Sequence, residues 1–444
     1  MVEISPELVV VLMFGGMLIG IFFGYPLAIV LGGVAMFVGM AAMGPPVFNL
    51  LRSRIYDFLS NYIFLAVPLF IYMGVVVERS GAAEKLYRGL YLWFGGVRGG
   101  LAIATVLMGT ILAACVGVIA ASVTMIGLVA MPSMLKRGYN KELVCGSVCA
   151  GGTLGILIPP SIMLIVYGSA AAISVGKLFM AAFMPGLVLS GLYMVYIAIH
   201  CWLNPQLAPV IAPEERAISL SKKVRVLLLG MLPPVFLVVA VLGTIFFGIA
   251  APTESAAIGC VAAIILAMSY RRFNWQIFRE GMLNTLRVTS MVYIIGFSAY
   301  MFTGVFLRLG GGDAVSNVLF SVPGGKWGFF TAIMFIVFVL GFFIDWIGIL
   351  FIIVPLVTPI GKALGFDTLW FAMMVCVNLQ MSFLTPPLAY TIFYVQGFAK
   401  PEWGIDTGHI IRGVVPFVVL IMVGLGLCLA FPEIILWLPG MMIK

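Results

Sequence analysis

Long apolar runs recur along the whole chain, and short segments rich in charged residues separate them. A membrane-spanning helix needs about 20 apolar residues. The runs therefore predict an all-α polytopic membrane protein with roughly eleven or twelve spans and some shorter re-entrant pieces. They lie at residues 8–23, 26–43, 61–77, 101–133, 143–174, 179–201, 224–250, 252–270, 285–307, 327–361, 368–398 and 412–431. The first run has the acidic residues Glu3 and Glu7 beside it and no basic flank, which favours a span over a removable signal peptide.

Three segments are more polar than the rest. Residues 203–223 hold three prolines and a cluster of charges, and they form the best divider between two halves. Residues 79–98 and 271–284 mix aromatic and charged side chains, a pattern that suits helices lying flat at the membrane interface as well as it suits ordinary loops.

One pattern occurs in both halves of the chain. Residues 109–132 form a hairpin rich in small residues, and GTLGILIPPSIMLIVYG follows at 152–168. In the second half GFFIDWIGILFIIVPLVTPI at 341–360 precedes NLQMSFLTPPLAYTIFYVQG at 378–397. Internally repeated spans that Pro or Gly interrupts are a strong sequence indication of a transporter binding site.

The Pro-Pro pairs explain why such spans suit transport. Each pair removes two N–H donors from its helix, and the freed carbonyls must face protein, water or an ion. Sodium is a hard cation that oxygen ligands bind well, and a half-helix starting at Ser161 or Leu388 directs its positive end at the break, which favours an anion. A simple helix kink is the alternative, but two matched breaks with hydroxyl neighbours favour a functional site. The freed carbonyls belong to Gly155 and Ile156 in the first half and to Ser382 and Phe383 in the second.

A few polar side chains inside the apolar runs are further candidates. Ser122 and Thr124 lie in the small-residue hairpin, whose composition ordinary helix packing also explains. Asp345 is a functional candidate because a carboxylate inside a membrane is costly. Glu254 is one as well, although an acid also suits the first turn of a helix that starts near Pro252. Asn378 and Gln380 precede the second break and either contact substrate or bridge helices.

Composition narrows the function classes. The 444 residues are 63% hydrophobic and 9% charged, whereas soluble domains carry about 25% charged residues. The net charge of +8 comes from basic residues in short loops, which mark cytoplasmic sides and give little support for a nucleic-acid partner. The seven cysteines lie in or beside apolar runs and predict no disulfides. No P-loop or nucleophile–base pair is present, so we expect an ion gradient to drive transport and no cofactor beyond the coupling ion.

These motifs closely resemble the large membrane subunit of tripartite ATP-independent periplasmic (TRAP) transporters. The resemblance covers nearly the whole chain and is carried by residues 117–139, 151–186, 251–257, 341–346 and 378–397. It implies a sodium-driven elevator built from two inverted repeats, each with a helical hairpin and a broken helix. It also implies a small membrane subunit, a periplasmic substrate-binding protein and an organic acid substrate, all at the inner membrane of a bacterium or archaeon.

The resemblance, together with the residues above, gives the expected organisation and sites. Scaffold helices are expected at 1–60, a first repeat at 61–202 (hairpin 101–133, broken helix 143–174), a linker at 203–223, and scaffold helices with an interfacial arm at 224–284. A second repeat at 285–431 (hairpin 313–361, broken helix 368–398) and a tail at 432–444 complete it. The expected sodium-site residues are Ser122, Thr124, Gly155, Ile156, Pro159, Asp345, Gly348, Ser382 and Thr385. The expected substrate-site residues are Thr153, Pro160, Ser161, Asn378, Gln380, Pro386 and Pro387.

Two departures from the family pattern concern the ion sites. The first hairpin has Ala120 and Ala121 before Ser122, where many relatives have a Gly-Ser-Ser-like tip, so ligation there would rely more on backbone. Some relatives place an acid a few residues after the hairpin aspartate, where this chain has Ile347 and Gly348. Two other functions compete with the TRAP interpretation. One is a stand-alone ion-coupled anion or dicarboxylate permease of the same superfamily, and the other, more remote, is a membrane-embedded enzyme.

Overall fold

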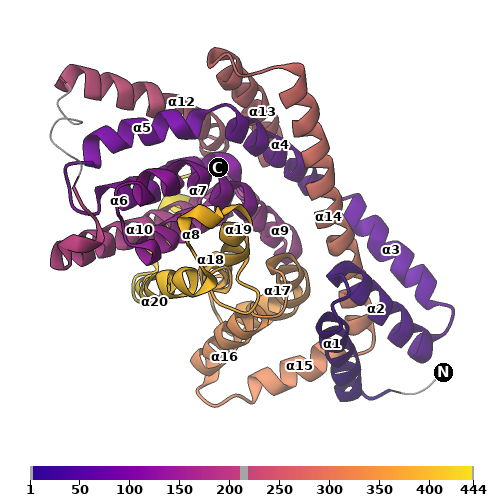
Figure 1. Ribbon diagram of the computed structural model, residues 1–444. Coiled ribbons are helices and arrows are strands. Elements are labelled where there is room, and N and C mark those ends of the chain that lie inside the picture. Colours follow the sequence, from indigo (N-terminus) through magenta and orange to yellow (C-terminus); the bar gives the residue numbers. More distant parts are fainter. Residues whose placement is uncertain (1–3, 211–218, 443–444) are drawn as a thin grey trace.

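A computed structural model describes residues 4–210 and 219–442, and helices without any strand make up the secondary structure of these residues (Figure 1). The α-helices are α1 (Pro6–Phe22), α2 (Leu27–Met43), α3 (Val47–Leu59), α4 (Ala66–Arg79), α5 (Ala82–Phe94), α6 (Gly100–Val116), α7 (Ile119–Leu135), α8 (Lys141–Leu157), α9 (Ile162–Ala171), α10 (Val175–Leu203), α12 (Leu220–Phe246), α13 (Pro252–Ser269), α14 (Trp275–Arg308), α15 (Gly311–Phe320), α16 (Gly325–Leu340), α17 (Trp346–Ala363), α18 (Thr368–Ser382), α19 (Tyr390–Phe398), α20 (Thr407–Ala430) and α21 (Glu433–Gly440). Three short 3₁₀ turns are η1 (Tyr62–Leu65), η2 (Pro205–Leu207) and η3 (Pro401–Trp403).

The four longest apolar runs each divide into two helices. Runs 101–133, 143–174, 327–361 and 368–398 become α6–α7, α8–α9, α16–α17 and α18–α19. A 17-residue helix such as α6 is about 26 Å long and falls short of the roughly 30 Å hydrocarbon core. By length and composition, seven described helices can cross a membrane, and the bent pair α8–α9 makes an eighth. This is fewer than the eleven or twelve spans expected, because six further apolar helices of the described residues have only 10–17 residues each, namely α1, α2, α6, α7, α16 and α18.

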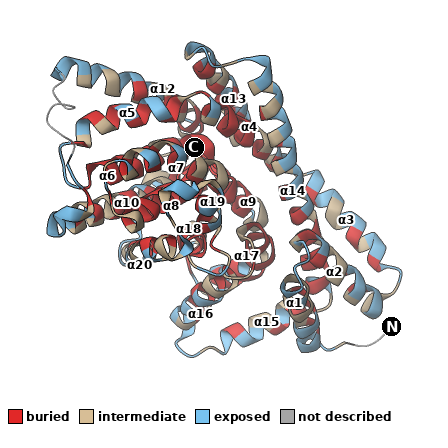
Figure 2. Ribbon diagram, viewed as in Figure 1, coloured by how far each residue is buried: buried red, intermediate tan, exposed pale blue. Residues whose placement is uncertain are grey.

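A central bundle holds both hairpins and both broken helices. Figure 2 shows that its helices are largely buried, while outer helices such as α1, α3 and α14 carry much exposed surface. Small residues permit the tightest contacts inside the bundle. A Cβ added to Gly109 of α6 would collide with the Gly151 carbonyl of α8, and one on Gly413 of α20 would collide with the Glu142 carbonyl of α8. The glycines thus place α6 and α20 directly against the first broken helix.

The two hairpins open toward opposite ends of α10. Near the end of α10, the base of hairpin α6–α7 is fixed by a hydrogen bond from Asn140 N to Leu207 O (2.8 Å), and Gly99 lies against Cys201. At the start of α10, Lys177 shares a pocket with Lys362 from the base of hairpin α16–α17. Since α10 has 29 residues and is about 43 Å long, these ends lie on opposite sides of a membrane. The hairpins are therefore inverted relative to each other.

An outer frame runs along one side of the bundle (Figure 1). Its longest member is α14, whose 34 residues extend for about 51 Å and pack against α2, α3, α4 and α17. Helices α4 and α13 pack together, as do α5 and α12. The frame and the bundle meet where α14 and α2 face the hairpin tips.

Three segments differ in the structure from the bounds or the character that the sequence predicts for them. The expected interfacial segment 271–284 is not a separate helix, because residues from Trp275 onward are continuous with α14. Segment 79–98 contains α5, which buries one face and packs on α12 and α6. The expected second hairpin, 313–361, begins later, at Gly325, and α15 before it packs on α1. The tail 432–444 contains α21, and part of the linker 203–223 lies outside the described residues.

Candidate functional site

The tip of the first hairpin lies against the first Pro-Pro break. Helix α6 ends at Val116, the next residue Gly117 has a φ of 65° that favours glycine, and α7 begins at Ile119. A Cβ on Gly117 would lie 3.2 Å from the carbonyl oxygen of Pro160. The absence of a side chain at Gly117 therefore allows the tip to approach the break.

At this break α8 and α9 meet at an angle of 41°. Pro159 and Pro160 leave the carbonyls of Gly155 and Ile156 without helical donors. The Ser161 hydroxyl donates to the Ile156 carbonyl, so it caps one of the two within the chain. Thr153, which was expected at the substrate, instead donates to Ala150 O one turn back (2.9 Å). Both hydroxyls are engaged, and substrate contact by either residue stays a prediction.

Ser122 lies beside the other freed carbonyl position. It is 2% exposed, and its Oγ has no hydrogen-bond partner among the described residues. A Cβ on Gly155 would overlap this Oγ and lie 3.1 Å from the Ser122 Cβ. The structure thus brings together Ser122 and Gly155, two residues predicted for the first sodium site. Thr124 lies apart from them in a pocket with Glu78 and Asn284.

The second break repeats this arrangement. Pro386 and Pro387 free the carbonyls of Ser382 and Phe383. The Thr391 hydroxyl donates to the Phe383 carbonyl at 2.9 Å, as Ser161 does at the first break. Ser382, 5% exposed, has an unpartnered Oγ, and a Cβ on Gly341 at the end of α16 would overlap it. Both Pro-Pro bonds are cis.

The other predicted residues around the second break are more dispersed. The Thr385 hydroxyl donates to Met381 O (2.8 Å), and Gly348 packs against the Leu27 side chain of α2 rather than at the break. The Asn378 amide donates to Met334 O of α16 (2.8 Å), which is the helix-bridging alternative considered for it. Gln380 is 1% exposed, and neither of its amide atoms has a partner among the described residues.

Glu254 has the helix-start role. Its Oε2 accepts from the N–H of Ala251, the residue just before α13, at 2.9 Å. Glu254 thereby satisfies a donor that the helix leaves free at its start.

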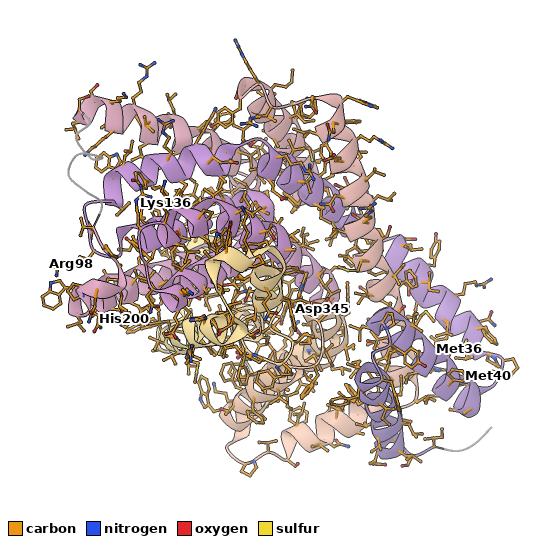
Figure 3. All side chains as sticks on the ribbon, viewed as in Figure 1. Met36, Met40, Arg98, Lys136, His200 and Asp345 are labelled. Atoms are coloured by element: carbon orange, nitrogen blue, oxygen red, sulfur yellow. The ribbon has the colours of Figure 1, made fainter. Side chains whose placement is uncertain are left out.

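A cavity of about 470 Å³ joins the two hairpin tips and both breaks. The first residues of four helices line it, namely Ile119 of α7, Ile162 of α9, Trp346 of α17 and Tyr390 of α19. Asp345, the residue before α17, also lines it, and Figure 3 shows Asp345 at the edge of the bundle that faces the frame. Helix N-termini attract anions, so four of them make this cavity an electrostatically favourable place for a carboxylate.

Comparison with known proteins decides the family. The sequence model described as "Tripartite ATP-independent periplasmic transporter, DctM component" matches residues 10–434. The chain belongs to this family. It is therefore a TRAP large permease, a multi-pass inner-membrane transporter subunit and not an enzyme, as the sequence predicted.

Three curated relatives illustrate the family. The C4-dicarboxylate TRAP transporter large permease protein DctM of Pseudomonas aeruginosa is 31% identical over 392 residues, which are 88% of this chain and 89% of the relative. The protein of the same name from Vibrio cholerae is 30% identical over 459 residues, with 98% and 97% covered. The ectoine/5-hydroxyectoine TRAP transporter large permease protein UehC of Ruegeria pomeroyi is 28% identical over 376 residues, with 84% and 85% covered.

A solved structure has a similar fold. The YdaH transporter of Alcanivorax borkumensis, described as having an unusual topology, superposes with a TM-score of 0.63 over 88% of this chain and 89% of its own. At 15% sequence identity this similarity concerns the fold alone.

The site of this TRAP large permease includes residues that were not predicted individually. Tyr390 and Tyr394 of α19 line the cavity with Asp345 and Trp346, and Thr391 caps the second break. The sequence signal was the run of aromatic and hydroxyl side chains directly after the second Pro-Pro pair. Their relation to Asp345 could not be read from the sequence, because it depends on how α19 packs against the second hairpin.

Proposed function

We propose that this chain is the membrane permease of a tripartite system that imports an organic acid and uses a sodium gradient to drive the import. The observation that carries the proposal is the cavity where four helix N-termini and both hairpin tips meet. The names of the relatives, which include carriers of C4-dicarboxylates and of ectoine, agree with an organic acid or a related carboxylate-bearing substrate.

Two sodium sites are proposed at the breaks. The first would use the Ser122 hydroxyl and backbone oxygens from Gly155 to Pro159, and the second would use Ser382 with the Asp345 region. Support comes from the two buried serine hydroxyls, each beside a glycine and each without a hydrogen-bond partner in the part of the chain that the structure describes. Unpartnered buried hydroxyls are rare because they cost about 1–3 kcal/mol, and a hard cation supplies the missing partner.

The proposed motion is an elevator movement of the bundle against the frame. The cavity lies between the two, and the part of the frame wall from α14 and α2 that lines it is apolar, so the bundle would slide along this part without breaking polar contacts. The inverted hairpins would let the bundle expose the cavity first to one side of the membrane and then to the other.

The proposed partners are those of the family's tripartite organisation. A small membrane subunit would pack on the exposed apolar surface of the permease within the bilayer. A periplasmic substrate-binding protein would deliver the acid, as the family description implies.

The test is uptake into proteoliposomes containing this chain and its small subunit. The radiolabelled acid would be the one that the cognate periplasmic binding protein retains. We expect uptake only with both an inward sodium gradient and the liganded binding protein. Uptake without the binding protein would indicate a stand-alone permease. Uptake that depends on a proton gradient and not on sodium would refute sodium as the coupling ion.

A further inference from the structure

The central cavity has two unlike walls. The bundle supplies the four helix starts, the aromatic residues Tyr390 and Tyr394, and one carboxyl group, that of Asp345. The frame supplies aliphatic side chains from α14 and α2, among them Val288, Met291 and Leu27. The helix starts of the bundle wall can therefore compensate a negative charge, and the opposite wall has no group that can.

The charged groups around the cavity sharpen this contrast. Among the described residues that line it there is no Arg, Lys or His, and Asp345 is the one ionisable carboxyl. Each helix N-terminus is equivalent to roughly half a positive charge, and this effect fades within the first turn. A substrate carboxylate at the helix starts away from Asp345 is compensated, whereas a second carboxylate that reaches the frame wall has no donor or cation.

From this contrast we infer that the cavity selects organic acids with a single carboxylate and an apolar body, and discriminates against dicarboxylates. The carboxylate lies at the helix starts of the bundle, and the body lies along α14 beside the rings of Trp346 and Tyr394. This inference rests on the proposed function, since it assigns the substrate class of the same cavity. It separates this chain from the relatives that are named for C4-dicarboxylates.

The volume of the cavity fits such a ligand. Small-molecule sites enclose about 300–1,000 Å³ and are mostly apolar with a few placed polar groups, and this cavity of about 470 Å³ agrees with both properties. A dicarboxylate short enough to keep both charges at the bundle wall would leave the apolar wall unfilled. One long enough to fill the cavity would place a charge against Val288 and Met291 without a partner.

The experiment compares acids that differ in one carboxylate only. Purified full-length chain in lipid nanodiscs, in sodium buffer, is titrated with pentanoate against glutarate and with hexanoate against adipate, and Kd is taken from the shift in melting temperature. We expect the monocarboxylate of each pair to bind roughly tenfold tighter or more, because the extra charge is unpaired. The measurement needs neither the binding protein nor transport.

A substitution on the frame wall provides the matched test. Met291 lines the cavity and is 51% exposed, so a longer polar side chain there meets little packing resistance. Met291→Arg places a cation opposite the helix starts, and we expect it to lower the monocarboxylate preference by about tenfold. Met291→Gln, similar in size and uncharged, should leave the preference unchanged.

The outcomes separate the inference from the proposed function. Equal or tighter binding of the dicarboxylates by the wild-type chain, or an unchanged preference in Met291→Arg, overturns the monocarboxylate assignment and leaves organic acid transport standing. Failure of all four acids to shift the melting temperature contradicts both this inference and the placement of the substrate in this cavity.

Discussion

Ser122→Ala tests the first sodium site, because its effect should depend on whether sodium is present. The wild-type hydroxyl is buried and has no hydrogen-bond partner within residues 4–210 and 219–442. An unsatisfied buried hydroxyl costs about 1–3 kcal/mol. Its removal should therefore leave the sodium-free protein as stable as wild type or more stable, whereas most buried substitutions destabilise.

In sodium the same substitution should be harmful. Loss of one oxygen ligand is expected to weaken sodium binding about tenfold, or about 1.4 kcal/mol. At a sodium concentration 100 times the wild-type Kd, the ion stabilises the folded wild type by about 2.7 kcal/mol, and in Ser122→Ala this falls to about 1.4 kcal/mol. The assay is tryptophan-fluorescence melting of the purified chain across a sodium series, with choline holding the ionic strength constant.

Ser147→Ala is the matched control. Ser147 is also fully buried, but its hydroxyl already donates to Val144 O at 3.0 Å within α8. This variant should keep the wild-type sodium dependence. If Ser122→Ala retains the full sodium-dependent stabilisation, or if Ser147→Ala loses as much of it, Ser122 is not an ion ligand.

Three further predictions follow from contacts at the breaks and in a loop. Gly341→Ala should lower stability by about 1–3 kcal/mol in a melting experiment, because the new Cβ would overlap the Ser382 side chain. Asn378→Leu should lower the melting temperature by an amount that corresponds to about 1–3 kcal/mol without changing the substrate KM, since its amide bonds α16. The backbone N–H of His409 holds the pKa of the Asp406 carboxyl below its usual value near 4, so this cap stabilises the fold above that pH and is lost as the pH falls through the lowered value. Melting of Asp406→Asn across pH 3–7 should therefore lack the acid-side loss that the wild type shows.

Each of these has a result that would count against it. Gly33 in α2 has no atom within 4 Å of an added Cβ, so Gly33→Ala should melt like wild type, and Gly341→Ala must melt lower than this control. A raised KM with unchanged stability in Asn378→Leu would place the amide at the substrate instead. An acid-side loss of equal size in Asp406→Asn and wild type would show that other groups cause it.

Much of the fold follows from local signals in the sequence. Apolar runs predict where helices lie, and each Pro-Pro pair predicts a break because two N–H donors are missing in any context. The continuity of α14 through Trp275–Arg308 was not predictable in this way, because its first turns are polar enough to resemble an interfacial segment. Its length is stabilised by packing against α2, α3 and α4.

The sequence predicts which regions form the candidate site better than it predicts the hydrogen bonds that individual side chains make there. Ser122 and Gly155 were both expected at the first ion site, and the structure places them in contact. Ser161 was expected to face substrate, yet its hydroxyl caps the Ile156 carbonyl. A hydroxyl beside a Pro-Pro break can satisfy the freed backbone or a ligand, and only the three-dimensional path of the chain decides between them. The cavity wall from α14 was not predicted, because its residues lie far from both Pro159 and Tyr390 in the sequence.

The burial of all seven cysteines has a practical consequence for measuring motion in this protein. Maleimides and nitroxide reagents react with thiolates that they can reach, and buried thiols are inert toward them. The native chain should therefore give little background labelling. A single cysteine introduced at Met291 on the frame, paired with one at an exposed bundle position such as Leu128, would then take two probes directly. Their separation, followed by spectroscopy with and without sodium, would report the displacement of the bundle along α14 in the otherwise native sequence.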